Sequence, residues 1–493
     1  MGMTKTEEWT GKAIKLEKLA DVIRRDGVSG ADWAFLDSSL KGRDGRYSIL
    51  GLYPYLQAEE RSGELFVNGE KQPGDLLGFL KDYIGNNRDR ENCSFTKNQD
   101  IQENSLVEKQ ENQNGGPVMT AGAVGWLSYD YGRKRAGIPG CHESSASSVD
   151  GGLPDGRFVF YDLYLVEDLM ENRVWICTRE NLAGLSHYRE KVRGWAEKAA
   201  VPGGERRSVG ADRNGGAVFS SDYEKEDYER TISRLTEYMR AGDIYVMNMT
   251  RRITADGIGD PYLMFRYLRE HNPSPFGAFL SFGDYQIVCA SPERFLRVRD
   301  GVAETSPIKG TRRRGDTPEE DQRLRQELAK SKKDRSELLM VVDLERNDLN
   351  RVCVPGSVKV PRMYYIESFA TVHHLISDVT GTLRPECGAV DLLDAAFPGG
   401  SITGAPKYRA MEIIDEQENS VRGLYTGTIG YLGLDGNCDF NIVIRTAVCR
   451  GGSCTIGVGG GITVDSDPEF EYEETNQKAA ALAEAIRRTS GQA

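Results

Sequence analysis

The sequence predicts an α+β protein in which antiparallel sheets are covered by helices. Two apolar runs, 276–282 and 285–290, are separated only by Gly283-Asp284, which is the turn chemistry of a tight hairpin. Residues 426–463 read as a meander of three strands, with turns at Asp435-Gly436 and Gly451-Gly452. No strand–helix–strand alternation carries a G-x-G-x-x-G motif, which argues against a dinucleotide-binding fold.

The N-terminal part, 1–215, is expected to be rich in antiparallel strands. Short runs of β-formers predict strands at 33–38, 45–51 and 123–130, and a paired ribbon at 158–167 and 173–178. Residues 86–117 are rich in Asn, Gln and Glu and nearly free of apolar residues, so they predict a disordered insertion. A Gly/Arg-rich break at 201–216 is expected to separate this part from the remainder, 216–493.

Helices are predicted mainly in the second part. The run 222–241 has an apolar face, Ser221 or Asp222 to cap it and Gly242 to end it, and a strand at 244–253 follows. Further helices are expected at 336–349, from Pro406 in a first turn to about 415, and from about 468 to 488.

Composition excludes several classes of protein. The net charge of −12 argues against nucleic acid as a partner. No apolar run approaches the ~18 residues that a membrane span needs, and the N-terminus lacks a secretory apolar stretch. We therefore expect a cytoplasmic protein without a membrane partner. The nine cysteines include no C-x-x-C, and there is no H-E-x-x-H, so neither a disulfide framework nor a zinc site is expected.

Carboxylates on two predicted helices could hold a metal ion. Glu471 and Glu474 are three residues apart on the last helix, and Lys478 shares their face. Glu337 opens the apolar run of the helix at 336–349, where an unpaired buried charge would be costly. Oxygen ligands of this kind suit Mg²⁺. The alternative is a set of surface carboxylates that pair with lysines.

Lys309 stands in an unusual setting for a lysine. It lies between Pro307-Ile308 and Gly310-Thr311, and three arginines follow at 312–314. Proline fixes one backbone angle, while glycine lets the chain turn close to a ligand. The alternative interpretation is an ordinary solvated loop lysine.

Two glycine-rich segments could seat an anion. Residues 397–407 lead into a helix N-terminus, and 458–462 end a strand with three glycines, although either could be a plain turn. Arg445, at the end of a predicted strand over 440–444, is expected to meet a carboxylate or phosphate. Tyr425 lies where the preceding strand begins.

In order along the chain stand SPERF, PIKGTRRR, SELLMVVDLERNDL, FATVHHLISDVTGTL, FPGGSITGAPK, DFNIVIRTAV and GGGITVDSDPEFEYEET. These segments resemble the chorismate-binding enzyme family, and weaker similarity in FLDSS, GRYSILG and GAVGWLSYDYGR extends the resemblance to nearly the whole chain. The resemblance implies one interlocked fold of two antiparallel β-sheets in a sandwich, with the active site in a cleft, and makes 216–493 the catalytic core.

The resemblance also implies roles for individual residues. Mg²⁺ would bind Glu337 and Glu474, with Glu471 beside them, and would meet one substrate carboxylate. Glu293 would be the general acid at the C4 hydroxyl, and His374 matches the catalytic histidine, although a satisfied core histidine is the alternative. The other substrate carboxylate and the rest of the pocket would be held by Tyr425, Arg445, Gly459, Gly460, Gly461, Gly310, Thr311, Ser401 and Lys478.

Lys309 decides the expected branch of the family. Members similar to anthranilate synthase component I carry alanine there, whereas lysine resembles the branch of aminodeoxychorismate synthase component I. The amine would attack C2 of chorismate and expel the C4 hydroxyl, and ammonia would then add at C4. The product, 4-amino-4-deoxychorismate, belongs to para-aminobenzoate and folate biosynthesis. The alternative is anthranilate synthesis for tryptophan. Bound Mg²⁺, Arg445 and the arginine run are together expected to favour the uncharged amine.

Two further features of the sequence bear on the nucleophile and on the source of ammonia. Water-using members place a lysine base where Val246 stands, so isochorismate or salicylate synthesis is not expected, although glutamine is usual in amine-using relatives. No cysteine lies in a glutaminase-like context, so ammonia is expected from a separate glutaminase subunit. Relatives hold tryptophan at positions that match Ser38, Pro273, Ser274 and Pro275. A catalytically silent, amino-acid-sensing subunit is the alternative from another class of protein.

Overall fold

The computed structural model of the protein describes residues 4–11, 14–27, 32–88, 116–142, 149, 151–200, 216–369 and 372–490. The insertion expected at 86–117 falls largely on 89–115, outside the described residues. The break expected at 201–216 falls on 201–215, which also lies outside them.

The α+β class is confirmed, and antiparallel pairing joins the described strands into one hydrogen-bonded network. In the N-terminal part the strands are β1 (Lys5–Glu8), β2 (Asp32–Asp37), β3 (Tyr47–Arg61), β4 (Glu64–Val67), β5 (Glu70–Gln72), β6 (Gly122–Leu127), β7 (Gly156–Asp168) and β8 (Arg173–Thr178). In the remainder they are β9 (Val218–Ser221), β10 (Val246–Asp256), β11 (Phe276–Phe282), β12 (Tyr285–Ser291), β13 (Arg294–Arg299), β14 (Val302–Thr305), β15 (Ile308–Arg313), β16 (Lys359–Ser368), β17 (Val372–Thr382), β18 (Gly404–Ala405), β19 (Thr428–Gly433), β20 (Cys438–Asn441), β21 (Thr446–Arg450) and β22 (Ser453–Ile462).

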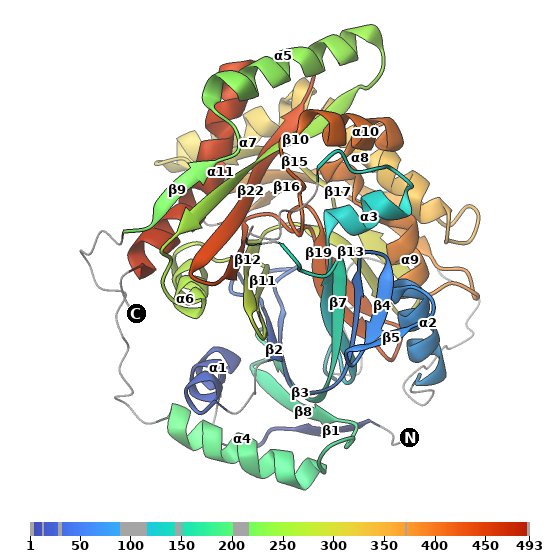
Figure 1. Ribbon diagram of the computed structural model, residues 1–493, viewed down its shortest axis with the longest axis vertical. Coiled ribbons are helices and arrows are strands. Elements are labelled where there is room, and N and C mark those ends of the chain that lie inside the picture. The colour runs from blue at the N-terminus through green and yellow to red at the C-terminus, as the bar shows by residue number, and fades with distance from the viewer. Residues whose placement is uncertain are drawn as a thin grey trace.

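The two parts of the chain share their sheets. β2 pairs with β11, and β6 pairs with β19, so N-terminal strands lie within the same layers as strands of the core. One apolar cluster takes Ala34 from β2 and Ile287 from β12 together with Val124 from β6 and Ile429 from β19. The side chains of this cluster therefore pack between two layers of strands. The strands form the expected sandwich (Figure 1).

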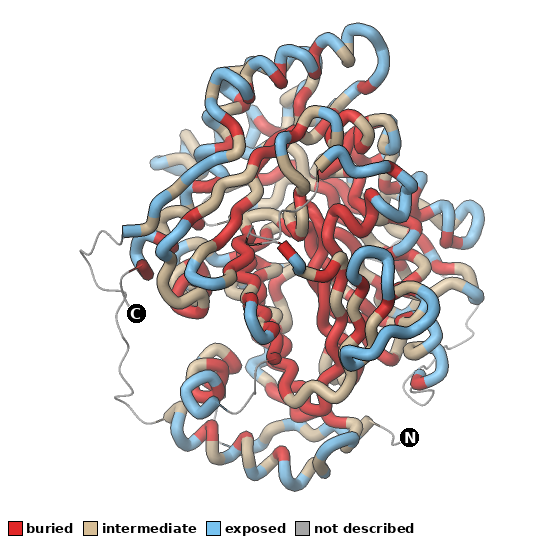
Figure 2. Tube along the Cα trace, viewed as in Figure 1, coloured by how far each residue is buried: buried red, intermediate tan, exposed pale blue. Residues whose placement is uncertain are grey.

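Helices lie on the outside of the sheets (Figure 1). Their outer faces are exposed and their inner faces buried (Figure 2). The helices are α1 (Leu16–Arg25), α2 (Leu76–Asn86), α3 (Tyr129–Arg135), α4 (Leu185–Ala199), α5 (Lys225–Ala241), α6 (Pro261–His271), α7 (Pro318–Lys330), α8 (Lys332–Asn350), α9 (Ala389–Ala396), α10 (Lys407–Gln417) and α11 (Pro468–Thr489), with a short 3₁₀ turn, η2, at Gly400–Ile402. Within the described residues, no helix has the length and apolar character needed to cross a bilayer.

Two predicted element boundaries were wrong because side chains form hydrogen bonds that the sequence pattern does not reveal. α5 begins at Lys225 with Glu224 as N-cap, since Asp222 accepts hydrogen bonds from Arg252 N and Ser420 Oγ instead of capping the helix. The strand expected at 123–130 ends at Leu127, because Ser128 Oγ accepts from Tyr131 N and starts α3.

The structure departs from prediction in four further places. In the N-terminal part, the strand expected at 45–51 is the beginning of the longer β3. Pro406 is the N-cap of α10 and not part of its first turn. The predicted meander contains four strands, because Arg445 has φ +50° and breaks the middle strand into β20 and β21. α8 begins at Lys332, so Glu337 lies in its second turn and does not open the helix.

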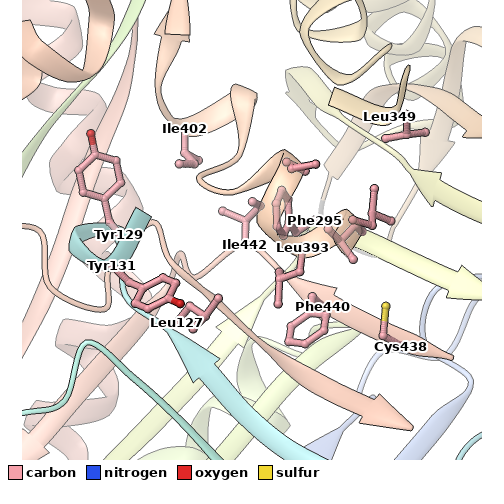
Figure 3. Packing of buried hydrophobic residues seen from close by; sticks show 14 of the residues in the cluster. Leu127, Tyr129, Tyr131, Phe295, Leu349, Leu393, Ile402, Cys438, Phe440 and Ile442 are labelled. Carbon is pink, nitrogen blue, oxygen red and sulfur yellow. The ribbon is translucent and has the colours of Figure 1, made fainter. Parts of the chain in front are cut away.

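An apolar core supports the turn that precedes α10. Phe295, Leu393, Ile402 and Ile442 belong to one buried cluster, which also contains Leu338 and Val342 of α8 (Figure 3). η2 therefore rests on well-packed side chains, and the polar residue Ser401 is carried on a firm support.

Candidate active site

A β-bulge in β15 directs Lys309. Lys309 pairs with Leu375 of β17 and Thr311 pairs with His374, so Gly310 is the extra residue between them. Lys309 Nζ donates a hydrogen bond to the carbonyl oxygen of Ser401 at 3.3 Å. The lysine is half-buried, and its amine lies against the short turn η2 and does not extend into solvent as that of an ordinary loop lysine would.

Gly310 is required by both its conformation and its surroundings. Its φ is +76°, which side chains with a Cβ rarely adopt. A Cβ at this position would lie 2.7 Å from Cγ of Asp334 on α8. The glycine therefore lets β15 approach α8 and aim Lys309.

Glu293 and Lys309 meet the same serine. Ser401 Oγ donates to Glu293 Oε1 at 3.0 Å, while the Ser401 carbonyl accepts from Lys309. Burial raises the pKa of Glu293 above its usual value, although Lys309, Lys478 and Arg445 act in the opposite direction. A carboxyl with a raised pKa can donate a proton to a leaving group next to a lysine amine.

The C-terminal part of β22, which contains three consecutive glycines, pairs with a neighbouring strand on one edge only among the described residues. Its pairing with β21 ends at Ile456, whereas its pairing with β10 continues to Ile462. The backbone of Gly459, Gly460 and Gly461 is therefore paired on one side only, and Lys478 Nζ donates to the Gly459 carbonyl at 2.9 Å. A Cβ on Gly460 would lie 2.8 Å from Glu474 Oε2, and one on Gly461 would lie 3.6 Å from Lys309 Nζ. These glycines allow charged side chains to come close to the strand.

Three carboxylates approach this edge. Burial raises the pKa values of Glu337 and Glu471, and the charge of Glu474 raises both further. Glu474 Oε2 is 2.9 Å from Lys478 Nζ, and Lys309 lowers the pKa of Glu337. Among the described residues, no three or more His, Cys, Asp or Glu side chains are gathered tightly enough to form a ready-made metal cluster. The donor chemistry nevertheless fits a hard cation, because a Mg²⁺ ion would relieve the repulsion among carboxylate oxygens.

Arg445 is a half-buried cation with no hydrogen-bond or ion-pair partner in the described part of the chain. Burial lowers its pKa, and Glu293 counteracts that effect. Its φ of +50° turns it out of the strands at the β20–β21 junction. Tyr425, in the turn before β19, has its ring against Gly457 of β22, where a Cβ would be 2.0 Å from the ring. An unpaired guanidinium can bind a carboxylate.

His374 is buried behind β15. Its Nδ1 lies 2.9 Å from Thr311 Oγ1, across the β15–β17 pair. Burial lowers its pKa to about 4, and the positive charge of Arg445 contributes. The imidazole is therefore neutral at neutral pH.

The arginines of the run 312–314 are paired with acidic residues. Arg312 pairs with Glu327 and Asp334, Arg313 with Glu320, and Arg314 with Asp321. These partners lie on α7 and α8 and partly neutralise the positive charge of the run.

Val246 lies beside the lysine. Its Cγ2 would be 4.0 Å from a Cβ on Gly461, on the side of the strand where Lys309 Nζ lies. An apolar methyl thus occupies the position at which the resemblance led us to look for a base.

Sequence reasoning missed Glu345. It is 3% exposed on α8 and lies under Gly400, next to Ser401. Its spacing from Leu338, Val341, Val342 and Leu349 places it on the buried face of the helix, so helical periodicity could have identified it.

The positions expected to hold tryptophan lie in a separate place. Ser38 Oγ is 2.8 Å from the carbonyl oxygens of both Tyr47 and Pro275. Ser38 and Pro275 line a cavity of about 1200 Å³, whereas Pro273 and Ser274 are not among its lining residues. None of the residues assigned to the Lys309 site lines this cavity.

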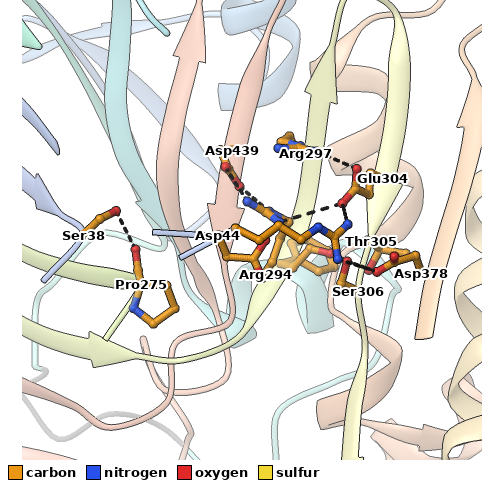
Figure 4. A network of polar contacts seen from close by, with 12 residues as sticks. Ser38, Asp44, Pro275, Arg294, Arg297, Glu304, Thr305, Ser306, Asp378 and Asp439 are labelled. Atoms are coloured by element: carbon orange, nitrogen blue, oxygen red, sulfur yellow. Dashed lines mark hydrogen bonds and ion pairs between the residues drawn. The ribbon is translucent and has the colours of Figure 1, made fainter. Parts of the chain in front are cut away.

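Some of the residues that line this cavity form a charged network, which Figure 4 shows. Arg294 pairs with Asp439 at 3.0 Å and with Asp44. Arg43 pairs with Glu304 at 2.8 Å and with Asp378 at 3.1 Å. The network joins Arg43 and Asp44 of the N-terminal part to strands of the core.

Comparison with known proteins gives a consistent result. A family model described as chorismate binding enzyme matches residues 63–484. Aminodeoxychorismate synthase component 1 of Bacillus subtilis (strain 168) is 35% identical over 450 residues, 90% of each chain. Anthranilate synthase component 1 of Acetivibrio thermocellus is 35% identical over 479 residues, 92% of this chain and 90% of that one. The crystal structure of anthranilate synthase component I from Streptococcus pneumoniae TIGR4 matches with a TM-score of 0.74 at 30% identity, over 90% of this chain and 93% of that chain.

Proposed function

The chain belongs to the chorismate-binding enzyme family, and from that premise we propose that it acts as an aminodeoxychorismate synthase component 1. The reaction would convert chorismate and ammonia into 4-amino-4-deoxychorismate through a covalent bond to Lys309. Relatives named for anthranilate synthesis match the chain to a comparable extent, so the choice depends on the site and not on overall similarity.

One observation supports the proposal above the others. The amine of Lys309 and the carboxyl of Glu293 contact the same residue, Ser401, the amine at its carbonyl oxygen and the carboxyl at its hydroxyl. A nucleophile next to a proton donor is the arrangement that displacement of a hydroxyl group requires. Alanine at position 309 would leave no nucleophile here.

The proposed chemistry has two displacements. In the first, the uncharged amine of Lys309 bonds to C2, both ring double bonds shift, and the C4–O bond breaks as Glu293 gives its proton to the departing hydroxyl. In the second, ammonia bonds to C4, both double bonds shift back, and the C2–N bond breaks. The lysine leaves as an amine, and the proton lost by ammonia returns to Glu293. The net reaction exchanges the C4 hydroxyl for an amine and releases water.

Substrate binding is assigned to the surrounding groups. Arg445, Tyr425 and the open edge of Gly459–461 would hold one carboxylate of chorismate, with Thr311, Gly310 and Lys478 completing the pocket. Glu337 and Glu474, with Glu471 beside them, would hold Mg²⁺, which supplies positive charge for the other carboxylate when bound. Neutral His374 is proposed as the catalytic histidine, oriented by its contact with Thr311.

Two partners are proposed in addition to chorismate. Ammonia would come from a separate glutaminase subunit. The cavity at Ser38 and Pro275 is large enough for a bound tryptophan, whose amino and carboxylate groups would meet its acidic and basic side chains. Titration calorimetry with tryptophan tests this second partner, and absence of heat at millimolar tryptophan would reject it.

Product analysis tests the function directly. The purified chain is incubated with chorismate, Mg²⁺ and an ammonium salt, and products are separated by chromatography. We expect 4-amino-4-deoxychorismate as the main product. Anthranilate as the main product would reject the proposal in favour of anthranilate synthase component 1, and unchanged chorismate would favour a silent subunit.

A further inference from the structure

Glu345 is a buried carboxyl to which the reaction scheme gives no role. It is 3% exposed, on the face of α8 that packs against η2. A Cβ on Gly400 would lie 3.4 Å from Glu345 Oε1, and the Gly400 N–H donates to this carboxyl. Glu345 therefore supports the turn from beneath, one residue before Ser401.

Few charges compensate this carboxyl. The charged groups that act on it most strongly are Asp348 from its own helix, Lys407 from α10 and Glu293 from the loop before β13. Lys407 Nζ is 2.6 Å from Asp348 Oδ2, so the cation among these groups is already paired. The acids of α9, Asp391 and Asp394, pair with Lys81 and Arg135.

The charge state of Glu345 follows from these contacts. Burial, with Asp348 and Glu293 adding to it, raises the pKa of Glu345 to about 8. At neutral pH the carboxyl is mostly protonated, and the Asp348–Lys407 pair is balanced by itself. Ionisation would add an uncompensated buried charge between Asp348 and Glu293, which the structure could relieve only by moving the turn or admitting water.

We propose that Glu345 is a positioning residue: its uncharged carboxyl supports the Gly400–Ser401 turn and thereby fixes Ser401 between Glu293 and Lys309. This inference rests on the proposed function, because it gives Ser401 its value as the residue that contacts both reacting groups. Glu345 itself acts only through Ser401.

Glu345→Gln is the direct test, because glutamine keeps the shape and an acceptor for Gly400 N–H but cannot ionise. We measure chorismate consumption with Mg²⁺ and ammonia from pH 6.5 to 9.5. Relative to the Gln variant, the wild-type kcat should fall about ten-fold between pH 7 and pH 9, since one group with a pKa near 8 ionises. Near pH 7 the two proteins should agree within about two-fold.

Two further variants separate positioning from general damage to α8. Glu345→Leu has no acceptor for Gly400 N–H, and we expect its kcat to fall about ten-fold at all pH values with a smaller change in KM for chorismate. Asp343→Asn, on the exposed face of the same helix and paired with Arg346, should retain the wild-type profile.

Identical pH profiles for wild type and Glu345→Gln would overturn the proposal, as would full activity of Glu345→Leu at neutral pH. Thermal unfolding gives a readout that does not depend on activity. Because the folded-state pKa of Glu345 lies above its unfolded value, stability should fall as pH rises from about 4.5 to 8, and the Gln variant should lose that component. Product identity is scored separately, so formation of anthranilate would reject the proposed function while the pH profiles still judge Glu345.

Discussion

Arg445 shows at the residue scale how this site differs from a structural ion pair. The Arg445 guanidinium is half-buried, and no carboxylate among the described residues forms an ion pair with it, although burial lowers its pKa. Arg422, in contrast, is buried and pairs with Glu418 at 2.7 Å. A cation without a partner costs stability, and a substrate anion would remove that cost.

These two arginines give opposite predictions when each is replaced by methionine. Arg445→Met should leave the free energy of unfolding unchanged or raise it by up to ~1 kcal/mol, because the substitution leaves no carboxylate without an ion-pair partner. Its KM for chorismate should rise at least about ten-fold. Arg422→Met should lower the free energy of unfolding by about 3 kcal/mol, because Glu418 would remain buried and unpaired. Urea unfolding and steady-state kinetics measure both, and a marked loss of stability in Arg445→Met would contradict the role of anion seat.

At the scale of single elements, the bulge in β15 and the broken strand at Arg445 determine where side chains point. The hairpin at 276–291 was predictable, because Gly283-Asp284 between two apolar runs has few other interpretations. The bulge at Gly310 was not, because it depends on α8 approaching at Asp334, a contact between segments that the local pattern does not specify. For the same reason the meander was predicted with three strands in place of four.

Gly310→Ala tests the bulge. The new methyl would require an unfavourable φ and would meet the Asp334 carboxyl, so we expect a loss of ~2 kcal/mol in the free energy of unfolding and severe loss of activity. Gly283→Ala is the matched control, since its φ is +58° but no atom lies within 4 Å of the added Cβ. It should lose only ~1 kcal/mol and retain activity. Equal effects of the two substitutions on activity would show that the close approach at Asp334 does not aim Lys309.

At the scale of the whole molecule, pairing across the two parts of the chain makes them interdependent. β2–β11 and β6–β19 are shared, and Arg43 and Asp44 reach the core through Arg294, Glu304 and Asp378. The ordered motifs of the second part allowed the fold family to be predicted from the sequence and supplied the candidate site residues. The register between distant strands and the charged network were not predictable, because they depend on partners 145 or more positions apart.

Arg294→Met tests this interdependence. Removing a buried arginine leaves Asp439 and Asp44 without their partner, so we expect a loss of about 3 kcal/mol or more in the free energy of unfolding. Arg230→Met, which breaks an exposed pair with Asp227 on α5, should change it by less than ~0.5 kcal/mol. Circular dichroism and tryptophan fluorescence should report coincident transitions, since Trp33 and Trp126 lie on the shared strands. Separated transitions would contradict a single interlocked fold.

The most direct measurement of the central claim is the intact mass of the protein after incubation with chorismate and Mg²⁺ in the absence of ammonia. The wild type should gain the mass of chorismate less one water, and ammonia should discharge the adduct. Lys71→Ala, an exposed lysine paired with Glu64, should behave like the wild type, whereas Lys309→Ala should gain no mass. A wild type that stays unmodified with chorismate and Mg²⁺ in the absence of ammonia, or the same adduct on Lys309→Ala, would contradict covalent catalysis at Lys309.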